Sequence, residues 1–180
     1  MVLRAKKKGS LAVMAGLSGS GKSTTAQQLA RQSHAIRLRS DAVRKHLAGI
    51  ALHEKGSDEI YTSEMTDKTY SRLIELGVGL AQRGDRIILD AKFDRQAKRQ
   101  EALSAANKNN LRITFIHCTA PQDVLKSRVE QRSGDIADAT AAILAKQSME
   151  PFAESDPVTV VATTRSDEEI QGVLSQVFES

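Results

Sequence analysis

Short apolar runs alternate along the chain with longer segments in which apolar residues recur at helical spacing. This alternation is typical of a parallel sheet whose two faces are covered by helices. It predicts five strands, which are Leu11–Ala15, Ile36–Arg39, Arg86–Asp90, Arg112–His117 and Val158–Ala162. The expected fold class is therefore α/β: a three-layer sandwich with a five-stranded, mainly parallel sheet between helices.

Helices are expected to begin between these strands, near Lys22, Ala42, Asp58, Asp94, Pro121, Asp138 and Asp167. Ser57 and Asp94 can accept hydrogen bonds from first-turn amides, and Ser166 with Glu169 matches a capping box. No repeat or shift in composition marks a second domain. We therefore expect a basic flexible tail over residues 1–9 and one domain over residues 10–180.

Composition narrows the classes of function. Four basic residues near the start, Arg4, Lys6, Lys7 and Lys8, account for the whole net charge of +4, so the rest of the chain is balanced. With aromatic residues at 3%, an extended base-stacking surface for single-stranded nucleic acid is hard to build. The sequence has neither a membrane-span pattern nor a secretory signal, which predicts a cytoplasmic protein without a membrane partner. Cys118 stands in an apolar run and is expected to be buried.

The first motif with chemistry is GLSGSGKST, which follows a predicted strand and opens a predicted helix. It fits the phosphate-binding pattern GxxxxGK[ST], in which backbone amides surround phosphate oxygens at the positive end of a helix. Lys22 is expected to reach the β- and γ-phosphates, and Ser23 to bind Mg²⁺. The predicted nucleotide-binding residues of the loop are Gly16, Ser18, Gly19, Ser20, Gly21, Lys22, Ser23 and Thr24. The fold prediction becomes a P-loop NTPase sandwich.

Asp90 ends a buried strand, which is the position of the acid that holds Mg²⁺ in P-loop proteins. The next residue is Ala91, whereas motor ATPases usually place a glutamate there. The guanine-recognition and switch motifs of GTPases also fail to match. Transfer of a phosphoryl group to a bound acceptor is therefore favoured over transfer to water.

Asp41 and Arg44 lie three residues apart at the end of the second predicted strand, where open α/β sheets bind ligands. Asp41 is expected to act as the general base for an acceptor hydroxyl, and Arg44 to hold a polar or anionic group of that acceptor. The alternative is that Asp41 only caps a helix and that Arg44 is a solvated charge.

Arg128 and Arg132 are four residues apart on one predicted helix face, before the Gly-containing segment Ser133-Gly-Asp135. Arginines on a closing lid stabilise charge on a transferring phosphoryl group, so a helical lid is expected over about residues 128–140. Arg132 is the predicted catalytic arginine, and Arg128 a nucleotide contact. A surface arginine stripe is the alternative.

From Leu11 to Gln147 the chain resembles P-loop kinase-like ATP-binding domains, which occur alone or fused behind aminoglycoside-phosphotransferase-like domains and are related to zeta toxins, gluconate kinase and polynucleotide 5′-hydroxyl kinases. The resemblance rests on the segments GLSGSGKST, RLRSDAVRKHLAG, LDAKFDRQAKRQEAL and LKSRVEQR, on the expected helix with Tyr70-Ser-Arg-Leu73, and on Asp138-Ala-Thr140 and Gln147. It implies the same nucleotide, acceptor and lid residues.

The family usually reads DATF where this chain has Asp90-Ala-Lys92-Phe93. Lys92, Arg95, Lys98 and Arg99 either meet an anionic acceptor or form a solvated helix face.

The leading hypothesis is an ATP- and Mg²⁺-dependent kinase that phosphorylates a hydroxyl of a small molecule. A polynucleotide 5′-hydroxyl kinase, which would bind nucleic acid, is the second. A nucleotide-binding regulatory NTPase is the third. The sequence does not specify the oligomeric state.

Overall fold

The computed structural model describes residues 6–133, 142 and 144–179. In chain order the elements are β1 (Ser10–Ala15), α1 (Lys22–Ser33), β2 (Ile36–Arg39), α2 (Ser40–Leu47), the 3-10 helix η1 (Asp58–Tyr61), α3 (Ser63–Gln82), β3 (Arg86–Asp90), α4 (Gln96–Lys108), β4 (Arg112–Thr119), α5 (Gln122–Ser133), β5 (Val158–Ala162) and α7 (Asp167–Leu174). The five predicted strands are confirmed. The helix expected near Asp138 lies outside the described residues.

The strands form one sheet in the order β2-β3-β1-β4-β5, and all neighbouring pairs are parallel. The central strand β1 is buried on both faces, which explains why its sequence is a continuous apolar run without alternation. Parallel strands bring their carboxyl ends to one edge. The β1–α1 loop with the start of α1, the start of α2 and the end of β3 therefore meet there, and they carry Lys22, Asp41 and Asp90 of the predicted site.

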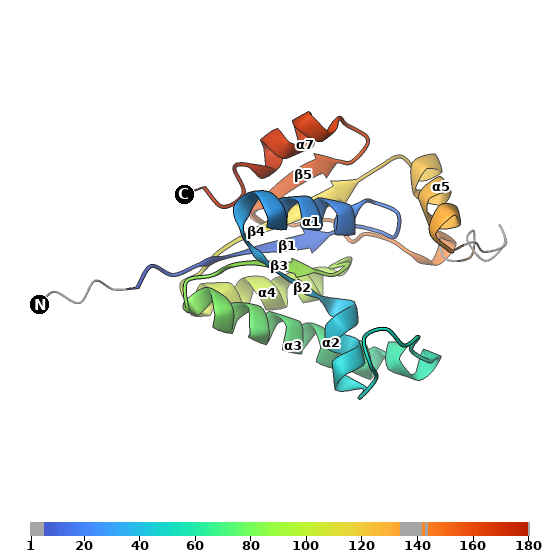
Figure 1. Ribbon diagram of the computed structural model, residues 1–180, viewed down its shortest axis with the longest axis horizontal. Coiled ribbons are helices and arrows are strands. Elements are labelled where there is room, and N and C mark those ends of the chain that lie inside the picture. Colours follow the sequence, from blue (N-terminus) through green and yellow to red (C-terminus); the bar gives the residue numbers. More distant parts are fainter. Residues whose placement is uncertain (1–5, 134–141, 143, 180) are drawn as a thin grey trace, which may run out of the picture.

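Helices α3 and α4 cover one face of the sheet, and α1 and α7 cover the other (Figure 1). Each face has its own apolar core. Alternate residues of β1 serve the two cores: Leu11 and Val13 pack towards α3 and α4, whereas Ala12 and Met14 pack towards α1 and α7. The predicted α/β three-layer sandwich is confirmed.

Two predicted helix caps are wrong, and one is confirmed. The 3-10 helix η1 follows Ser57, whose side chain makes no capping hydrogen bond. Helix α4 begins after Arg95 instead of at Asp94, and the carboxylate of Glu150, far along the chain, accepts from the Gln96 amide at 2.6 Å. The capping box of Ser166 and Glu169 forms as expected.

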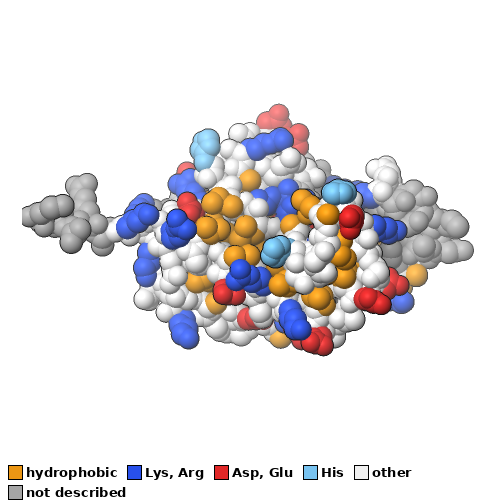
Figure 2. All heavy atoms as spheres, turned by 60° about the horizontal axis from the view of Figure 1, so that its bottom comes forward, with side chains coloured by type: hydrophobic (Ala, Val, Ile, Leu, Met, Phe, Trp, Pro, Cys, Tyr) orange, Lys and Arg blue, Asp and Glu red, His pale blue; other side chains and the backbone are white. Residues whose placement is uncertain are grey.

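Basic, acidic and apolar side chains are interspersed over the face shown in Figure 2, in keeping with the balanced charge of the chain after its first residues. Near the start of the described chain, the Gly9 amide donates to the Ala81 carbonyl at 2.7 Å, and Lys8 Nζ donates to the Asn109 carbonyl at 2.9 Å. A search of the described helices finds none with the length and apolar character that a bilayer span requires.

Candidate active site

The loop between β1 and α1 has open backbone amides at a helix start. Gly21, the N-cap residue of α1, has φ 86°, a conformation that side chains disfavour, and no side chain caps the helix. Gly19 has φ 81°, and a Cβ there would lie 2.6 Å from the Leu125 carbonyl oxygen. Since no acidic residue occupies the first turn of α1, the positive helix end is available to an anion.

The interior of this loop fits a phosphate group. Ser20 is almost fully buried, and its Oγ has no hydrogen-bond partner among the described residues. A buried hydroxyl without a partner is costly, so a ligand oxygen would stabilise it.

Contacts from distant segments hold the loop in shape. The Gly16 amide donates to the Lys92 carbonyl at 2.9 Å, and the Ser18 amide donates to Gln147 Oε1 at 2.9 Å. Thr163 Oγ1 donates to the Ser20 carbonyl at 2.7 Å. The loop is thus preorganised by the loop after β3, by the segment before β5 and by the turn after β5.

Lys22 lies in the first turn of α1, and its Nζ donates to the Leu17 carbonyl at 3.1 Å. Burial lowers its pKa to about 8, while the nearby charge of Asp90 acts in the opposite direction. The hydrogen-bond partner of Lys22 Nζ is a neutral carbonyl, and a phosphate oxygen would give this ammonium group a negatively charged partner.

Asp90 ends β3 in a buried position, where Arg37 of β2 binds it. Arg37 Nε and Nη2 both donate to Asp90 Oδ2, at 2.8 and 2.5 Å. Asp90 lines the same cavity as Lys22 and the exposed Ser23. A carboxylate and a hydroxyl are the donors that Mg²⁺ prefers, so Ser23 and Asp90 fit the predicted metal site.

That cavity has a volume of about 700 Å³ and opens at the carboxyl ends of β2 and β3. Lys22, Ser23 and Asp90 form the wall next to the β1–α1 loop, and α2 contributes Asp41 and Arg44. Asp41 is partly exposed and lies 3.5 Å from Lys45 Nζ. The structure therefore brings the predicted base and the predicted phosphate-binding residues to one cavity.

Arg44 lies deeper than expected, since it is 9% exposed. Its Nη1 donates to the Ile60 carbonyl at 2.8 Å and to Thr66 Oγ1 at 3.2 Å, and its guanidinium lies 5.1 Å from the centre of the Tyr61 ring. Arg44 thus connects α2 to η1 and α3 while still lining the cavity.

A second cavity, of about 320 Å³, adjoins the same loop at Gly21 and Thr24. Arg128 and Arg132 of α5 and Thr163 complete much of its wall. Arg128 Nη1 donates to the Gly19 carbonyl at 3.1 Å and to Thr163 Oγ1 at 2.8 Å, so this arginine fastens α5 to the phosphate loop. The remainder of the predicted lid, beyond Ser133, lies outside the described residues.

Arg99 fits neither alternative given for it, an anionic-acceptor contact or a solvated helix face. Arg99 is fully buried, and its guanidinium donates to the carbonyls of Phe93, Glu150 and Pro151. Lys98 lines the cavity but forms a 2.7 Å ion pair with Asp67.

Sequence reasoning missed three residues that position the site: Arg37, Gln147 and Thr163. Each acts on a partner far away in the sequence. Arg37, a charged residue in a short strand, and Gln147, one of the residues of the family resemblance, gave a signal, whereas Thr163 gave none.

Comparisons with known proteins show which family the chain resembles. The chain matches the AAA domain family over residues 11–151. It is 30% identical over 139 residues to an uncharacterized protein of Mycobacterium tuberculosis, covering 75% of this chain and 28% of that protein. It is 26% identical over 170 residues to the thermoresistant gluconokinase of Escherichia coli, covering 93% of this chain and 90% of the relative. The chain thus spans little more than a quarter of the length of the mycobacterial relative.

Solved structures share the fold. The APS kinase of Mycobacterium tuberculosis, in complex with AMPPNP and APS, superposes with a TM-score of 0.71 at 22% identity, covering 97% of this chain and 99% of that one. A gluconokinase from Sinorhizobium meliloti gives a TM-score of 0.65 at 19% identity, covering 97% and 96%. The P-loop kinase fold expected from the sequence is therefore confirmed.

Proposed function

The chain belongs to the AAA domain family, and we propose that it is an ATP- and Mg²⁺-dependent phosphotransferase acting on a hydroxyl group of a small molecule. One observation carries the proposal: Asp41 lines the same 700 Å³ cavity as Lys22, Ser23 and Asp90. A hydrolase needs only a water molecule next to the γ-phosphate, whereas a kinase needs a cavity for its acceptor and a base for the acceptor hydroxyl. The similarity to Escherichia coli gluconokinase, of which 90% is covered, supports a small acceptor.

The residues have distinct roles in the proposed transfer. The loop amides and Lys22 bind the triphosphate, with the nucleoside in the cavity at Gly21 and Thr24. The acceptor oxygen attacks the γ-phosphorus as the bond to the β,γ-bridging oxygen breaks, and Asp41 takes the hydroxyl proton. ADP and the phosphorylated acceptor result. Arg132 meets the charge that develops on the phosphoryl oxygens.

Ser23 and Asp90 would hold Mg²⁺, and Arg37 fixes the orientation of Asp90. Bound Mg²⁺ neutralises charge on the phosphate oxygens.

An acceptor screen that reads ADP release tests this function. The panel comprises sugars, sugar acids, sugar phosphates, aminoglycosides and 5′-hydroxyl oligonucleotides, with ATP alone as the blank. We expect at least one small molecule of the panel to stimulate ADP release from ATP. This stimulation should be lost in Lys22→Ala. ADP release that never depends on a small-molecule acceptor would contradict the proposal. Release dependent only on oligonucleotides would replace it with polynucleotide kinase activity.

A further inference from the structure

We propose that the acceptor carries an anionic group, a carboxylate or a phosphoryl group, and that Lys92 and Arg95 bind this group. The inference rests on the proposed kinase function and adds the chemical class of the acceptor. The charged side chains that line the 700 Å³ cavity carry this inference.

Most acids that line the cavity are already neutralised. Asp90 is bound by Arg37, Asp67 by Lys98 at 2.7 Å, and Asp41 lies 3.5 Å from Lys45. Arg37 and Lys45 do not line the cavity. They therefore neutralise Asp90 and Asp41 while the cations that line the cavity stay available to a ligand. Asp94 is the remaining acid of the wall.

Four cations of the wall form no ion pair with a described residue: Lys22, Arg44, Lys92 and Arg95. Lys22 belongs to the phosphate loop, and Arg44 is held by the Ile60 carbonyl and Thr66, so Lys92 and Arg95 are the two that remain for an acceptor. Both lie in the loop between β3 and α4. Arg39 adds a third cation, whose nearest carboxylate oxygen, on Asp41, is 4.0 Å away. An anionic ligand would meet this excess of positive charge.

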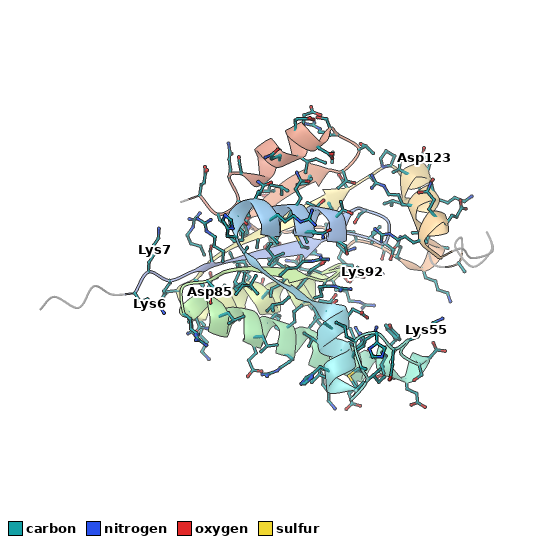
Figure 3. The ribbon with its side chains drawn as sticks, in the orientation of Figure 1. Lys6, Lys7, Lys55, Asp85, Lys92 and Asp123 are labelled. Carbon is teal, nitrogen blue, oxygen red and sulfur yellow. The ribbon has the colours of Figure 1, made fainter. Side chains whose placement is uncertain are left out.

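Lys92 is placed at the reaction centre and not on an outer surface. Figure 3 shows it at the carboxyl ends of the strands, between α2 and α5, whereas Lys6 and Lys7 lie at the opposite end of the sheet. The Lys92 carbonyl accepts from the Gly16 amide, so its backbone is joined to the phosphate loop. A ligand held by Lys92 would therefore lie next to the transferring phosphoryl group.

The loop that carries the two cations is rigidly held between them, at Phe93. Phe93 is fully buried with φ 42°, its amide donates to Tyr70 Oη at 3.3 Å, and its ring packs edge-on against Tyr70. The buried Arg99 donates to the Phe93 carbonyl at 2.7 Å. Because the loop is already ordered, it loses little conformational entropy when a ligand binds, which favours a specific charge contact.

The geometry also separates the two ends of the acceptor. Asp41 on α2 faces the cavity from the β2 side, and Lys92 and Arg95 face it from the β3 side. Arg44, which the sequence suggested as the anion contact, already uses Nη1 on Ile60 and Thr66. The acceptor is thus a molecule with a hydroxyl at one end and an anion at the other.

Matched acceptors test the inference in the intact protein. Gluconate is compared with glucitol, and glycerol 3-phosphate with glycerol, so that each pair differs in one anionic group. We expect the anionic member of at least one pair to have the higher kcat/KM. Lys92→Gln and Arg95→Gln should each raise its KM about tenfold or more, as loss of one charge-assisted hydrogen bond does, with the KM for ATP within about twofold.

The control variant is Lys7→Gln, which removes an equal charge at the far end of the sheet and should change neither KM. Equal use of the neutral and anionic members would overturn the inference while leaving the kinase function intact. If Lys92→Gln raised only the KM for ATP, the inference would also be overturned, because Lys92 would then bind the nucleotide instead of the acceptor.

A binding measurement separates this inference from failure of the kinase proposal. If no pair is phosphorylated, gluconate, glucitol, glycerol 3-phosphate and glycerol are titrated by calorimetry into protein saturated with AMPPNP and Mg²⁺. Binding of an anionic member that is tighter than that of its neutral partner, and that is lost in Lys92→Gln but kept in Lys7→Gln, supports the inference. Binding without preference for the anion, or no binding of any member, overturns it.

Discussion

Lys22 shows how one buried charge prepares the site for its ligand. Its Nζ has a backbone carbonyl, that of Leu17, as its hydrogen-bond partner, and burial lowers its pKa to about 8. The ammonium form is therefore destabilised in the free protein and stabilised once phosphate oxygens surround it. Nucleotide binding must then raise the pKa of Lys22.

This linkage predicts a pH-dependent affinity. Below a pH of about 8 Lys22 is charged in both the free and the bound protein, so the affinity for AMPPNP is full. Above it the free protein loses the proton, and affinity should fall by up to about tenfold per pH unit until the pKa of the bound state is reached. Calorimetric titration from about pH 7 to about pH 9.5 measures the slope. In Lys22→Arg, whose charge persists, the slope should vanish, and an equal slope in both proteins would refute the assignment.

Arg132 is expected to act mainly in the transition state. It lines the cavity next to Thr24 and is exposed, so it is free to approach the phosphoryl group. Arg132→Ala should lower kcat by about a hundredfold or more, the scale of arginine-finger effects, with a smaller change in the KM for ATP. Steady-state kinetics on the accepted substrate measure both. A loss confined to ATP affinity would make Arg132 a nucleotide contact only.

The residues of the motifs could be predicted from the sequence, but the distant residues that hold them in position could not. Lys22, Asp41 and Asp90 follow from a loop pattern and from strand ends, because those local features fix their place at the edge of the sheet. Gln147 and Thr163 bind the phosphate loop across more than a hundred residues of chain. No local pattern encodes such a contact, since it depends on where two separate segments come to lie.

At the scale of elements, apolar runs identified β1, β3 and β4 because these strands lie in the middle of the sheet and contribute buried residues to its cores. The edge strands β2 and β5 are only partly buried. The helix starts were less accurate where tertiary contacts replace local caps. The Gln96 amide of α4 is capped by Glu150, and the α2–α3 connection forms the short η1 before α3 begins. These features depend on a partner outside the element.

Two glycines of α3 provide a matched test of its packing. A Cβ on Gly77 would lie 2.7 Å from Leu89 Cδ2, and Leu89 is fully buried, whereas a Cβ on Gly79 would meet nothing within 4 Å. Gly79→Ala should raise the free energy of unfolding by about 0.5–1 kcal/mol through helix propensity. Gly77→Ala should lower it by about 1 kcal/mol, because overpacking outweighs that gain.

Urea unfolding of the two variants beside the original protein measures this difference. Equal stabilisation by both alanines would show that α3 does not pack on β3 as described.

At the scale of the whole molecule, the strand order explains why residues that follow or end three different strands line one cavity. With β1 next to β3, and β3 next to β2, the phosphate loop, Asp90 and Asp41 come to one edge of the sheet. Figure 1 shows α2 and α5 at that same end. Two cavities adjoin the phosphate loop, and in the proposed two-substrate reaction one would take the nucleoside and the other the acceptor.

The central claim is that the γ-phosphoryl group passes to an acceptor beside Asp41, and a single-turnover experiment with γ-labelled ATP tests it most directly. The fraction of label on the acceptor and on free phosphate is followed for the original protein and for Asp41→Asn. Because Asp41 is partly exposed, the substitution should leave thermal stability and AMPPNP affinity nearly unchanged. We expect label on the acceptor hydroxyl, formed about a hundredfold more slowly in Asp41→Asn. Label found only in free phosphate, or equal transfer rates in the two proteins, would contradict the account.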